Sequence, residues 1–320
     1  MNPIAILQRL SHRHFCSGSE IASQLGVSRA SVHNALASAK ALGVEVFAVH
    51  GRGYRLVEPL SWLNADALQA QLGTQGWSLD FALQRESTNR HLMDLSRQGA
   101  PHRQIVLTEW QSAGRGRRGR GWQALPGGGL LFSVLWRFSR PVGALSGLSL
   151  AVGVALAEGL QKQGMDAVQL KWPNDLLWQG RKLGGILIEL EGDMLGPGNA
   201  VIGVGLNVRL PDALRARIDQ PTADVFEALG ACDRNALLLS LLDALDVELT
   251  AFEQSGFAPA RSRWEALHAW QNQPVRVLLG NGETQEGVLR GIDAQGALRV
   301  DDGGVIHTLH SGEVSVRRRT

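Results

Sequence analysis

The chain has 320 residues, which is too long for one ordinary hydrophobic core, so we expect two or three domains. Its composition, 44% hydrophobic and 19% charged, is typical of a globular protein and excludes a disordered chain. The net charge of +2 excludes the strong global field that marks many nucleic-acid-binding proteins.

The cysteines and the apolar segments indicate where the protein works. Cys16 and Cys232 are the only cysteines, so the sequence has no disulfide framework and no metal-ligand spacing, which favours a reducing compartment. Residues 1–15 lack the pattern of a secretory signal, and the longest apolar stretch, about 145–157, is too short for a membrane span. We therefore expect a cytoplasmic protein without a membrane partner.

The first 62 residues predict a winged helix-turn-helix. A short helix capped by Ser19, a turn at Gly26 and a longer helix capped by Ser28 form the helical part. Two alternating runs, 44–49 and 54–57, predict a β-hairpin with a basic tip, the wing. The expected DNA contacts lie early on the second helix and on the wing: Ser28, Arg29, Ser31, His33, Asn34, Arg52 and Arg55. A winged helix that serves only as a protein-interaction module is the alternative.

Residues 63–270 predict a central domain of mixed helices and strands. A helical linker is expected at 61–71. The expected strands are 104–109, 130–136, 185–191 and 200–208, and the expected helices are 89–97, 144–163 and 236–253. Because helices and strands interleave without a regular βαβ rhythm, α+β is favoured over a doubly wound sheet. Residues 271–320 carry short alternating runs between tight turns, which predict a small SH3-like β-barrel.

Residues 114–121 consist only of glycine and arginine, in a segment (110–157) that has six arginines and no acidic residue. Glycine lets the backbone approach a ligand, and guanidinium groups bind phosphate or carboxylate oxygens. We expect an anion-binding loop that is mobile until a ligand orders it. Gly114, Gly116 and Gly119 match the dinucleotide-binding pattern G-x-G-x-x-G, but this match is rejected. A strand-like run rather than a helix follows, and no acidic residue that could bind a ribose occurs up to residue 157. A solvated, RNA-binding basic loop is the alternative.

Lysine is scarce: there are four lysines against 28 arginines, and two of them, Lys171 and Lys182, lie in dense motifs. Lys171 begins the run Lys-Trp-Pro-Asn-Asp after an apolar run, where a compact cation can stabilise charge on a phosphoryl group. A lysine that merely ends a strand is the alternative. Glycines inside the apolar strands 184–188 and 203–208 indicate close approach by a ligand, and bulged buried strands are the alternative.

Together these motifs resemble those of the biotin–protein ligases, in the same order and across essentially the whole chain. They are Ser87-Thr88-Asn89, Gln111 to Arg120, Lys171 to Asp175, Lys182 to Glu189 and Gly203 to Asn207. With the winged helix, the chain resembles the bifunctional bacterial form that also represses the biotin operon. The resemblance implies a central ligase domain of class II synthetase-like type, which adenylates biotin with ATP and transfers it to a lysine of a carrier protein.

The resemblance also implies residue roles. The expected catalytic residues are Lys171, Arg115, Arg117, Arg118 and Arg120. Those expected to bind biotin are Ser87, Thr88, Asn89, Gln111, Gly114, Arg115, Gly116, Arg117, Lys171, Gly184, Gly185, Ile186, Leu187, Gly203 and Gly205. Those expected to bind the nucleotide are Arg117, Arg118, Arg120, Trp122, Asn174, Asp175, Lys182 and Asn207.

The implied cofactors are ATP and Mg²⁺, with biotin as substrate. The implied partners are the biotin carboxyl carrier protein of acetyl-CoA carboxylase, operator DNA and, when the adenylate is bound, a second copy of the chain. One departure stands out: repressors of this family carry an aromatic residue that covers the adenine near 220–226, and here no aromatic occurs before Phe226. A lipoate–protein ligase and a biotin-sensing repressor without catalysis are the alternative functions.

Overall fold

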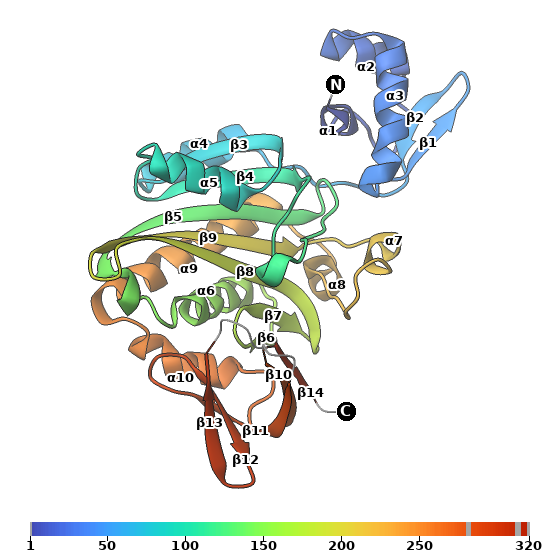
Figure 1. Ribbon diagram of the computed structural model, residues 1–320. Coiled ribbons are helices and arrows are strands. Elements are labelled where there is room, and N and C mark those ends of the chain that lie inside the picture. Colours follow the sequence, from blue (N-terminus) through green and yellow to red (C-terminus); the bar gives the residue numbers. More distant parts are fainter. Residues whose placement is uncertain (1, 280–282, 311–314, 319–320) are drawn as a thin grey trace.

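The computed structural model describes residues 2–279, 283–310 and 315–318 (Figure 1). A small N-terminal unit projects from a central body built around one sheet, and a second, smaller sheet closes the opposite end (Figure 1). Helices and strands are mixed without a doubly wound order, so the α+β prediction is confirmed. In the part of the chain that the structure describes, no helix has both the length and the apolar character that a membrane crossing requires.

The N-terminal unit is the predicted winged helix-turn-helix. Its elements are α1 (Pro3–Leu7), α2 (Gly18–Leu25), α3 (Arg29–Ala39), η1 (Lys40–Leu42), β1 (Val46–Val49) and β2 (Gly53–Leu56). The predicted cap of α2 was wrong: Ser17 rather than Ser19 caps it, because the Ser17 hydroxyl accepts from the Ser19 amide. Ser28 caps α3 as predicted. Gly26 takes a left-handed φ of 64°, which lets α2 end sharply.

The predicted helical linker begins later than expected. Residues 57–64 contain no helix, and α4 (Ala65–Thr74) starts at the Asn64 cap. Leu68 and Leu72 of α4 are buried in the core of the central body. This helix therefore belongs to the central body.

A mixed seven-stranded sheet forms the central body, in the order β3-β4-β5-β9-β8-β7-β6. The strands are β3 (Ser78–Arg85), β4 (Gln104–Gln111), β5 (Gly129–Pro141), β6 (Val168–Lys171), β7 (Asp175–Trp178), β8 (Arg181–Gly192) and β9 (Pro197–Asn207). β3 and β4 are parallel, and the other neighbours are antiparallel. The sequence patterns missed β3, β6 and β7.

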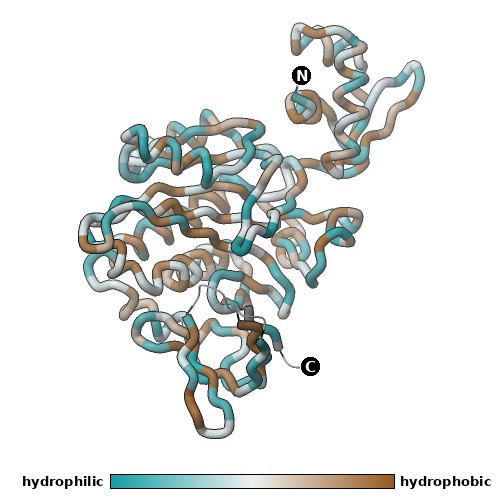
Figure 2. Tube along the Cα trace, viewed as in Figure 1, coloured by the Kyte–Doolittle hydropathy of each residue, from teal (hydrophilic) through white to brown (hydrophobic). Residues whose placement is uncertain are grey.

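Side chains that alternate along the strands divide the sheet into two faces. On one face, Phe132 and Val134 of β5 and Ile202 of β9 belong to the main hydrophobic core. On the other face, α5 (Thr88–Arg97) packs through Leu92 on Val106, Leu135 and Val201. Figure 2 shows the apolar residues concentrated along the central strands and the helices behind them.

Helices and turns complete the central body. They are η2 (Arg117–Gly119), η3 (Val142–Ala144), α6 (Leu148–Lys162), α7 (Asp212–Arg215), α8 (Val225–Leu229), α9 (Arg234–Ser255) and α10 (Ala258–Leu267). α6 begins four residues later than predicted, because η3 and Gly147 precede it. Leu156 and Leu160 of α6 and Leu241 of α9 are buried in the main core.

The C-terminal strands form an antiparallel sheet in the order β13-β12-β11-β10-β14, five strands within the described residues. They are β10 (Pro274–Leu278), β11 (Thr284–Ile292), β12 (Leu298–Asp302), β13 (Val305–Leu309) and β14 (Ser315–Arg318). Val275, Leu289 and Val300 join the main core, so this sheet packs firmly against the central body. The domain boundaries at 62/63 and 270/271 stay predictions.

Candidate functional site

A cavity of about 540 Å³ lies on the face of the central sheet that carries α5. Its wall comes from the start of α5, the arginine–glycine loop, the turn after β6, the strands β8 and β9, the segment 217–222 and Val316 of β14. Nearly all the residues predicted for the ligand site line it. The structure therefore brings together motifs that lie more than a hundred residues apart in the chain.

Strand register decides which pocket glycines face this cavity. Gly185 pairs with Gly205, and Leu187 pairs with Gly203, so these four residues lie on the same face. All four line the cavity. Gly184 faces the core beside Leu206 and lies outside the lining. Gly114 also lies outside the lining. A Cβ on Gly114 would lie 2.6 Å from the backbone carbonyl oxygen of Trp122.

The start of α5 forms a buried polar floor. Ser87, Thr88 and Asn89 are each less than 5% exposed. Ser87 caps the helix, with its hydroxyl accepting from the Arg90 amide, and such a hydroxyl still has a hydrogen to donate. The Thr88 amide donates to Gln111 Oε1 at 2.7 Å, which leaves the Gln111 Nε2 as a donor. This end of the cavity therefore offers neutral hydrogen-bonding groups.

The two cavity glycines of β9 make room for protein side chains. A Cβ on Gly203 would lie 2.0 Å from Asn89 Oδ1, and a Cβ on Gly205 would lie 2.6 Å from the ring of Trp122. The ring of Trp122 also lies against Gly185, 3.3 Å from the position of a Cβ there. The glycines were predicted to admit a ligand. The structure shows that they also admit Asn89 and Trp122, which themselves line the cavity.

The arginine–glycine loop forms a narrow hairpin over the cavity. Arg115 pairs with Gly121 in an isolated bridge, and the Gly116 amide donates to the Arg120 carbonyl at 2.7 Å. Within the hairpin, Arg118 has a left-handed φ of 59°. Arg115, Gly116, Arg117, Arg118 and Arg120 all line the cavity. Mobility of this loop before ligand binding stays a prediction.

Two arginines connect this loop to the rest of the site. An Arg115 Nη lies 3.0 Å from Glu189 Oε1, and an Arg117 Nη donates to Asn174 Oδ1 at 3.3 Å. Burial lowers the pKa of Arg117, and the nearby Asp175 opposes that effect. Desolvated guanidinium groups bind an anion more strongly than exposed ones. The loop therefore presents positive charge to the interior of the cavity.

A cluster of three charges lies where β6 ends and β7 begins, with Lys182 reaching it from β8. Lys182 Nζ is 2.7 Å and Lys171 Nζ is 3.5 Å from oxygens of Asp175. Burial is the main cause that lowers the pKa of Lys171, and the attraction of Asp175 opposes it. Lys171 also lies over the ring of Trp270, 5.3 Å from its centroid. Because two lysines share one carboxylate, the cluster retains a net positive charge.

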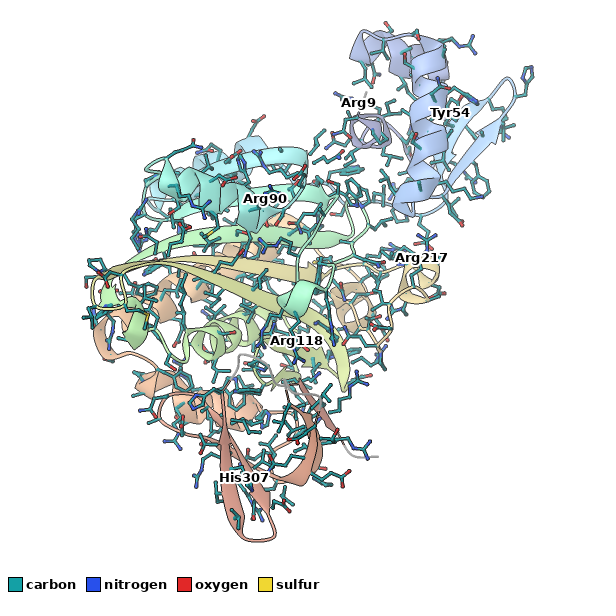
Figure 3. All side chains as sticks on the ribbon, in the orientation of Figure 1. Arg9, Tyr54, Arg90, Arg118, Arg217 and His307 are labelled. Carbon is teal, nitrogen blue, oxygen red and sulfur yellow. The ribbon has the colours of Figure 1, made fainter. Side chains whose placement is uncertain are left out.

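Some lining residues were missed by the sequence patterns. Arg217, Ile218 and Asp219 come from the segment after α7, and Val316 comes from the C-terminal sheet. Gln220 and Thr222 also line the cavity, and they lie in the region 220–226 that the resemblance relates to the adenine. Figure 3 shows Arg118 on the loop in front of the sheet and Arg217 beside α7. No spacing rule identifies residues that reach a site from loops and from a separate sheet.

Two aromatic residues near the predicted adenine region, Phe226 and Trp122, lie in different surroundings. The Cζ of Arg209 lies over the ring of Phe226, 4.4 Å from the ring centroid. Phe226 is not among the cavity-lining residues. Trp122, by contrast, lines the cavity, and Lys182 Nζ lies 5.7 Å from its ring centroid. Asn207 lies behind Lys182 and donates to the Ala223 carbonyl at 3.1 Å.

The arrangement has two chemically different ends. One end has neutral donors and acceptors on α5 and at Gln111, and the other has the arginine loop and the Lys171–Asp175–Lys182 cluster. Such a cavity suits a ligand with two parts. A neutral polar ring would lie at the first end, and a carboxylate together with a phosphate would lie at the second.

The predicted DNA-binding residues lie on α3 and its cap and on the wing of the winged helix. Arg29, His33 and Asn34 of α3 are exposed, and Ser31 and Ser28 lie at its start. His33 Nδ1 is 3.3 Å from the Tyr54 hydroxyl of β2, so the helix and the wing are linked (Figure 3). On the wing, the guanidinium carbons of Arg52 and Arg55 lie 4.6 and 5.1 Å from the ring centroid of Phe15.

Three family profiles match the chain in order. The HTH domain matches residues 4–55, the Biotin/lipoate A/B protein ligase family matches 81–207, and the Biotin protein ligase C terminal domain matches 272–317. The two outer matches coincide with the winged helix and the C-terminal sheet. The middle match includes most of the cavity-lining residues.

Individual relatives agree with these matches. The chain is 39% identical to the "Bifunctional ligase/repressor BirA" of Escherichia coli K12, covering 98% of this chain and 97% of that protein. It is 35% identical to the "Biotin--[acetyl-CoA-carboxylase] ligase" of Mycobacterium tuberculosis, covering 75% and 89%. Among solved structures, the biotin protein ligase of Aquifex aeolicus in complex with biotin and ATP matches with a TM-score of 0.64 and 27% identity, covering 75% of this chain and 99% of that one.

Proposed function

This chain belongs to the biotin–protein ligase family, in the branch of the bifunctional ligase/repressor BirA, and on that premise we propose that it has two activities. As a ligase it adenylates biotin with ATP and transfers biotin to a lysine of a carrier protein. As a repressor it binds DNA through its winged helix. The finer assignments proposed here are Mg²⁺ as cofactor, the carrier of acetyl-CoA carboxylase, operator DNA, an adenylate-bound homodimer and a cytoplasmic location.

The observation that carries the ligase assignment is the two-ended cavity. Ser87 can donate to a ureido carbonyl, Thr88 can accept from the neighbouring N–H, and Gln111 Nε2 supplies a further donor. At the other end, the arginine loop and Lys171 face the position where the carboxylate of biotin would meet the α-phosphate of ATP. One cavity thus offers groups suited to both parts of an acyl-adenylate.

The reaction needs positioning and positive charge rather than a protein nucleophile. An oxygen of the biotin carboxylate attacks the α-phosphorus, the bond from that phosphorus to the pyrophosphate oxygen breaks, and the biotinyl-adenylate remains. Lys171 and the loop arginines stabilise the negative charge of the transition state, and burial strengthens this interaction. The acceptor lysine, as a free amine, then attacks the acyl carbon and releases AMP.

Mg²⁺ fits this site only together with the nucleotide, whose phosphates would offset the positive charge of the two lysines. Among the described cavity-lining residues only Asp175 and Asp219 carry carboxylates, and Asp175 already contacts two lysines. Mg²⁺ is commonly bound by one or two carboxylates together with substrate phosphates, so Asp175 with Asn174 would hold it here. Bound in this way, the ion would supply charge neutralisation for the pyrophosphate leaving group.

The ligase assignment is tested with the full chain, ATP, Mg²⁺ and a biotin-carboxyl-carrier domain, with biotin or lipoate as the acid. We expect biotin-dependent release of pyrophosphate and a carrier whose mass increases by one biotinyl group. Modification by lipoate alone would support the lipoate–protein ligase alternative. Absence of both products, with DNA binding intact, would support a repressor without catalysis.

The repressor assignment is tested by gel shift on promoter DNA of biotin-synthesis genes, with and without biotinyl-adenylate. Arg52→Ala on the wing should weaken binding to all DNA sequences alike. The slope of log K against log salt concentration should decrease by about one, as expected for the loss of one phosphate contact. Asn34→Ala on α3 should reduce discrimination between sequences. Binding that remains non-specific and salt-labile with the adenylate would contradict the repressor assignment. Sedimentation of the same samples tests the proposed homodimer.

A further inference from the structure

We propose that Asn89 and Ser133 set the direction of the hydrogen bond at Thr88, so that the site selects an acid whose ring presents an N–H group there. Thr88 touches the ligand in this proposal, whereas Asn89 and Ser133 are positioning residues. The inference rests on the proposed function, since it concerns how the ring of the acid is chosen. Three contacts among buried side chains carry it.

The orientation of the Asn89 amide follows from its neighbours. Its Nδ2 lies 3.0 Å from the Leu187 carbonyl and 3.0 Å from Glu189 Oε2. A carbonyl and a carboxylate only accept, so Nδ2 must face them and both of its hydrogens are used. Glu189 is held in place because its other oxygen lies 3.0 Å from an Arg115 Nη. The Asn89 Oδ1 is therefore left as an acceptor that faces β5.

Ser133 must donate to that oxygen. Ser133 is fully buried on β5, directly opposite Gly203, and its Oγ lies 2.6 Å from Asn89 Oδ1. Two oxygens at this distance need a hydrogen between them, and only Ser133 can supply it. The glycine is required for this geometry, because a Cβ on Gly203 would lie 2.0 Å from Asn89 Oδ1.

The Thr88 hydroxyl must then donate its hydrogen to another protein group and not to a ligand in the cavity. Its Oγ1 lies 2.8 Å from Ser133 Oγ, whose single hydrogen is already used. Its other neighbour, Gln111 Oε1 at 3.2 Å, can only accept. Whichever of the two receives the Thr88 hydrogen, the hydroxyl has only lone pairs left for the cavity that Thr88 lines.

A hydroxyl restricted in this way distinguishes between acids of similar size. The cyclic urea of biotin has N–H groups that can donate to Thr88. The dithiolane ring of lipoate has none, so the Thr88 oxygen would be buried without a donor. Sites built around such a hydrogen bond reject an analogue that lacks the donor by factors on the order of 10⁴. The relay from Glu189 to Thr88 therefore contributes to the choice of biotin.

The test compares biotin with its two cyclic carbamate analogues, in each of which one ureido N–H is replaced by oxygen. Dissociation constants are measured calorimetrically on the full chain. In the wild type, one carbamate should bind at least about 100-fold more weakly than biotin. In Ser133→Ala the Thr88 hydrogen is free to turn towards the ring oxygen, so this ratio should fall about tenfold or more. Ser133→Thr keeps the hydroxyl and should retain the wild-type ratio.

Ser96→Ala is the matched control. Ser96 lies on α5, is 6% exposed, and its buried hydroxyl has no hydrogen-bond partner within the described residues. This variant loses an equally buried hydroxyl outside the relay, so its ratio should not change. If Ser133→Ala does not fold, Gly203→Ala reaches the same relay by displacing Asn89 and should lower the ratio in the same way.

An unchanged ratio in a folded Ser133→Ala or Gly203→Ala variant would overturn the proposal. So would a wild type that binds biotin and both carbamates equally, although biotin would then still be the substrate. Failure of the wild type to bind biotin at all, with lipoate bound instead, would contradict the proposed function. The two failures are therefore distinguishable.

Discussion

Lys171 combines two properties that decide its chemistry, namely burial and a shared carboxylate. Burial lowers its pKa from an ordinary 10.5, and Asp175 only partly offsets this effect. A lysine with a lowered pKa loses its proton at a lower pH than usual. The cation that we propose to stabilise the phosphoryl group is therefore lost earlier as the pH rises.

This predicts the alkaline limb of the pH profile. In the wild type, kcat/KM for biotin should begin to fall below pH 10.5 and then decrease about tenfold per pH unit. Lys171→Arg retains its charge throughout, so its profile should lack this limb even if its activity is lower. Steady-state kinetics across pH 7–10 with both proteins provide the measurement. An identical limb in the arginine variant would assign it to another group.

Burial also lowers the pKa of His268, a buried residue outside the cavity lining. Burial lowers the pKa of His268 to about 4, and its ring stacks on Trp264 with centroids 4.5 Å apart. Between pH 6.5 and 4 the unfolded chain binds this proton and the folded chain does not, so stability falls as the pH falls. The difference in pKa corresponds to about 3 kcal/mol by pH 4.

His268→Phe keeps a ring but cannot bind the proton. We expect the urea midpoint of this variant to change less than that of the wild type between pH 6.5 and 4. Any difference between the two proteins should disappear above pH 7, apart from a constant offset due to packing. Equal acid sensitivity of the two proteins would show that His268 does not contribute to the acid loss of stability.

Among the elements, β9 shows how a single strand serves two neighbours. Gly203 admits Asn89, which belongs to the neutral end of the cavity, and Gly205 admits Trp122, which lies beside Lys182. The two positions are one strand repeat apart, so both face the cavity. The glycines therefore act at different ends of the site.

Replacing each glycine in turn should affect the two substrates differently. Gly203→Ala displaces Asn89 and should raise KM for biotin about tenfold or more, with a smaller effect on ATP. Gly205→Ala displaces Trp122 and should raise KM mainly for ATP. Initial rates with each substrate varied in turn measure the split. Equal effects of the two variants on both substrates would indicate that the strand as a whole has shifted.

At the scale of the whole molecule, the winged helix and the ligase body meet at residues that are close in sequence to the cavity lining. Leu125, which follows the arginine loop, and Leu210 and Leu214, which precede the lining segment 217–222, are buried in the core of the winged helix. Beside them, Arg209 forms an ion pair with Glu58 at 2.9 Å. The arginine loop and the segment 217–222 therefore lie next to residues that are packed in the core of the winged helix.

A fully buried ion pair anchors the connection between the two units. Arg234 and Glu109 are both inaccessible to solvent, with an Nη–Oε2 distance of 2.7 Å. Glu109 Oε1 accepts from the Leu63 amide, and Arg234 donates to the Ser61 carbonyl and to the Gly129 carbonyl. The pair therefore connects the interdomain segment to the strand that follows the arginine loop.

Removing one partner of this pair should cost more than removing both charges. Arg234→Met leaves a buried carboxylate and should destabilise the ligase body by about 3–5 kcal/mol. Adding Glu109→Gln removes that charge while keeping an acceptor for Leu63, so the double variant should recover part of the loss. Urea denaturation of the three proteins measures this, and limited proteolysis at residues 57–64 reports the release of the segment. A double variant no more stable than Arg234→Met would contradict the argument.

The sequence by itself determined the features that depend on neighbouring residues. The cap at Ser28, the arginine–glycine loop, the lysine motif and the three structural units all follow from local composition and period, and the family resemblance follows from the order of the motifs. The cap at Ser17 and the start of α4 were misplaced, because several polar residues compete for each helix end.

Only the tertiary structure decided how the site is assembled. Strand register turns Gly185 towards the cavity and Gly184 towards the core, and it places Ser133 opposite Gly203. The contact between Ser133 and Asn89 joins residues 44 positions apart, and Val316 reaches the cavity from another sheet. Such contacts depend on how strands pair and pack across the whole chain, and no local pattern in the sequence encodes that pairing.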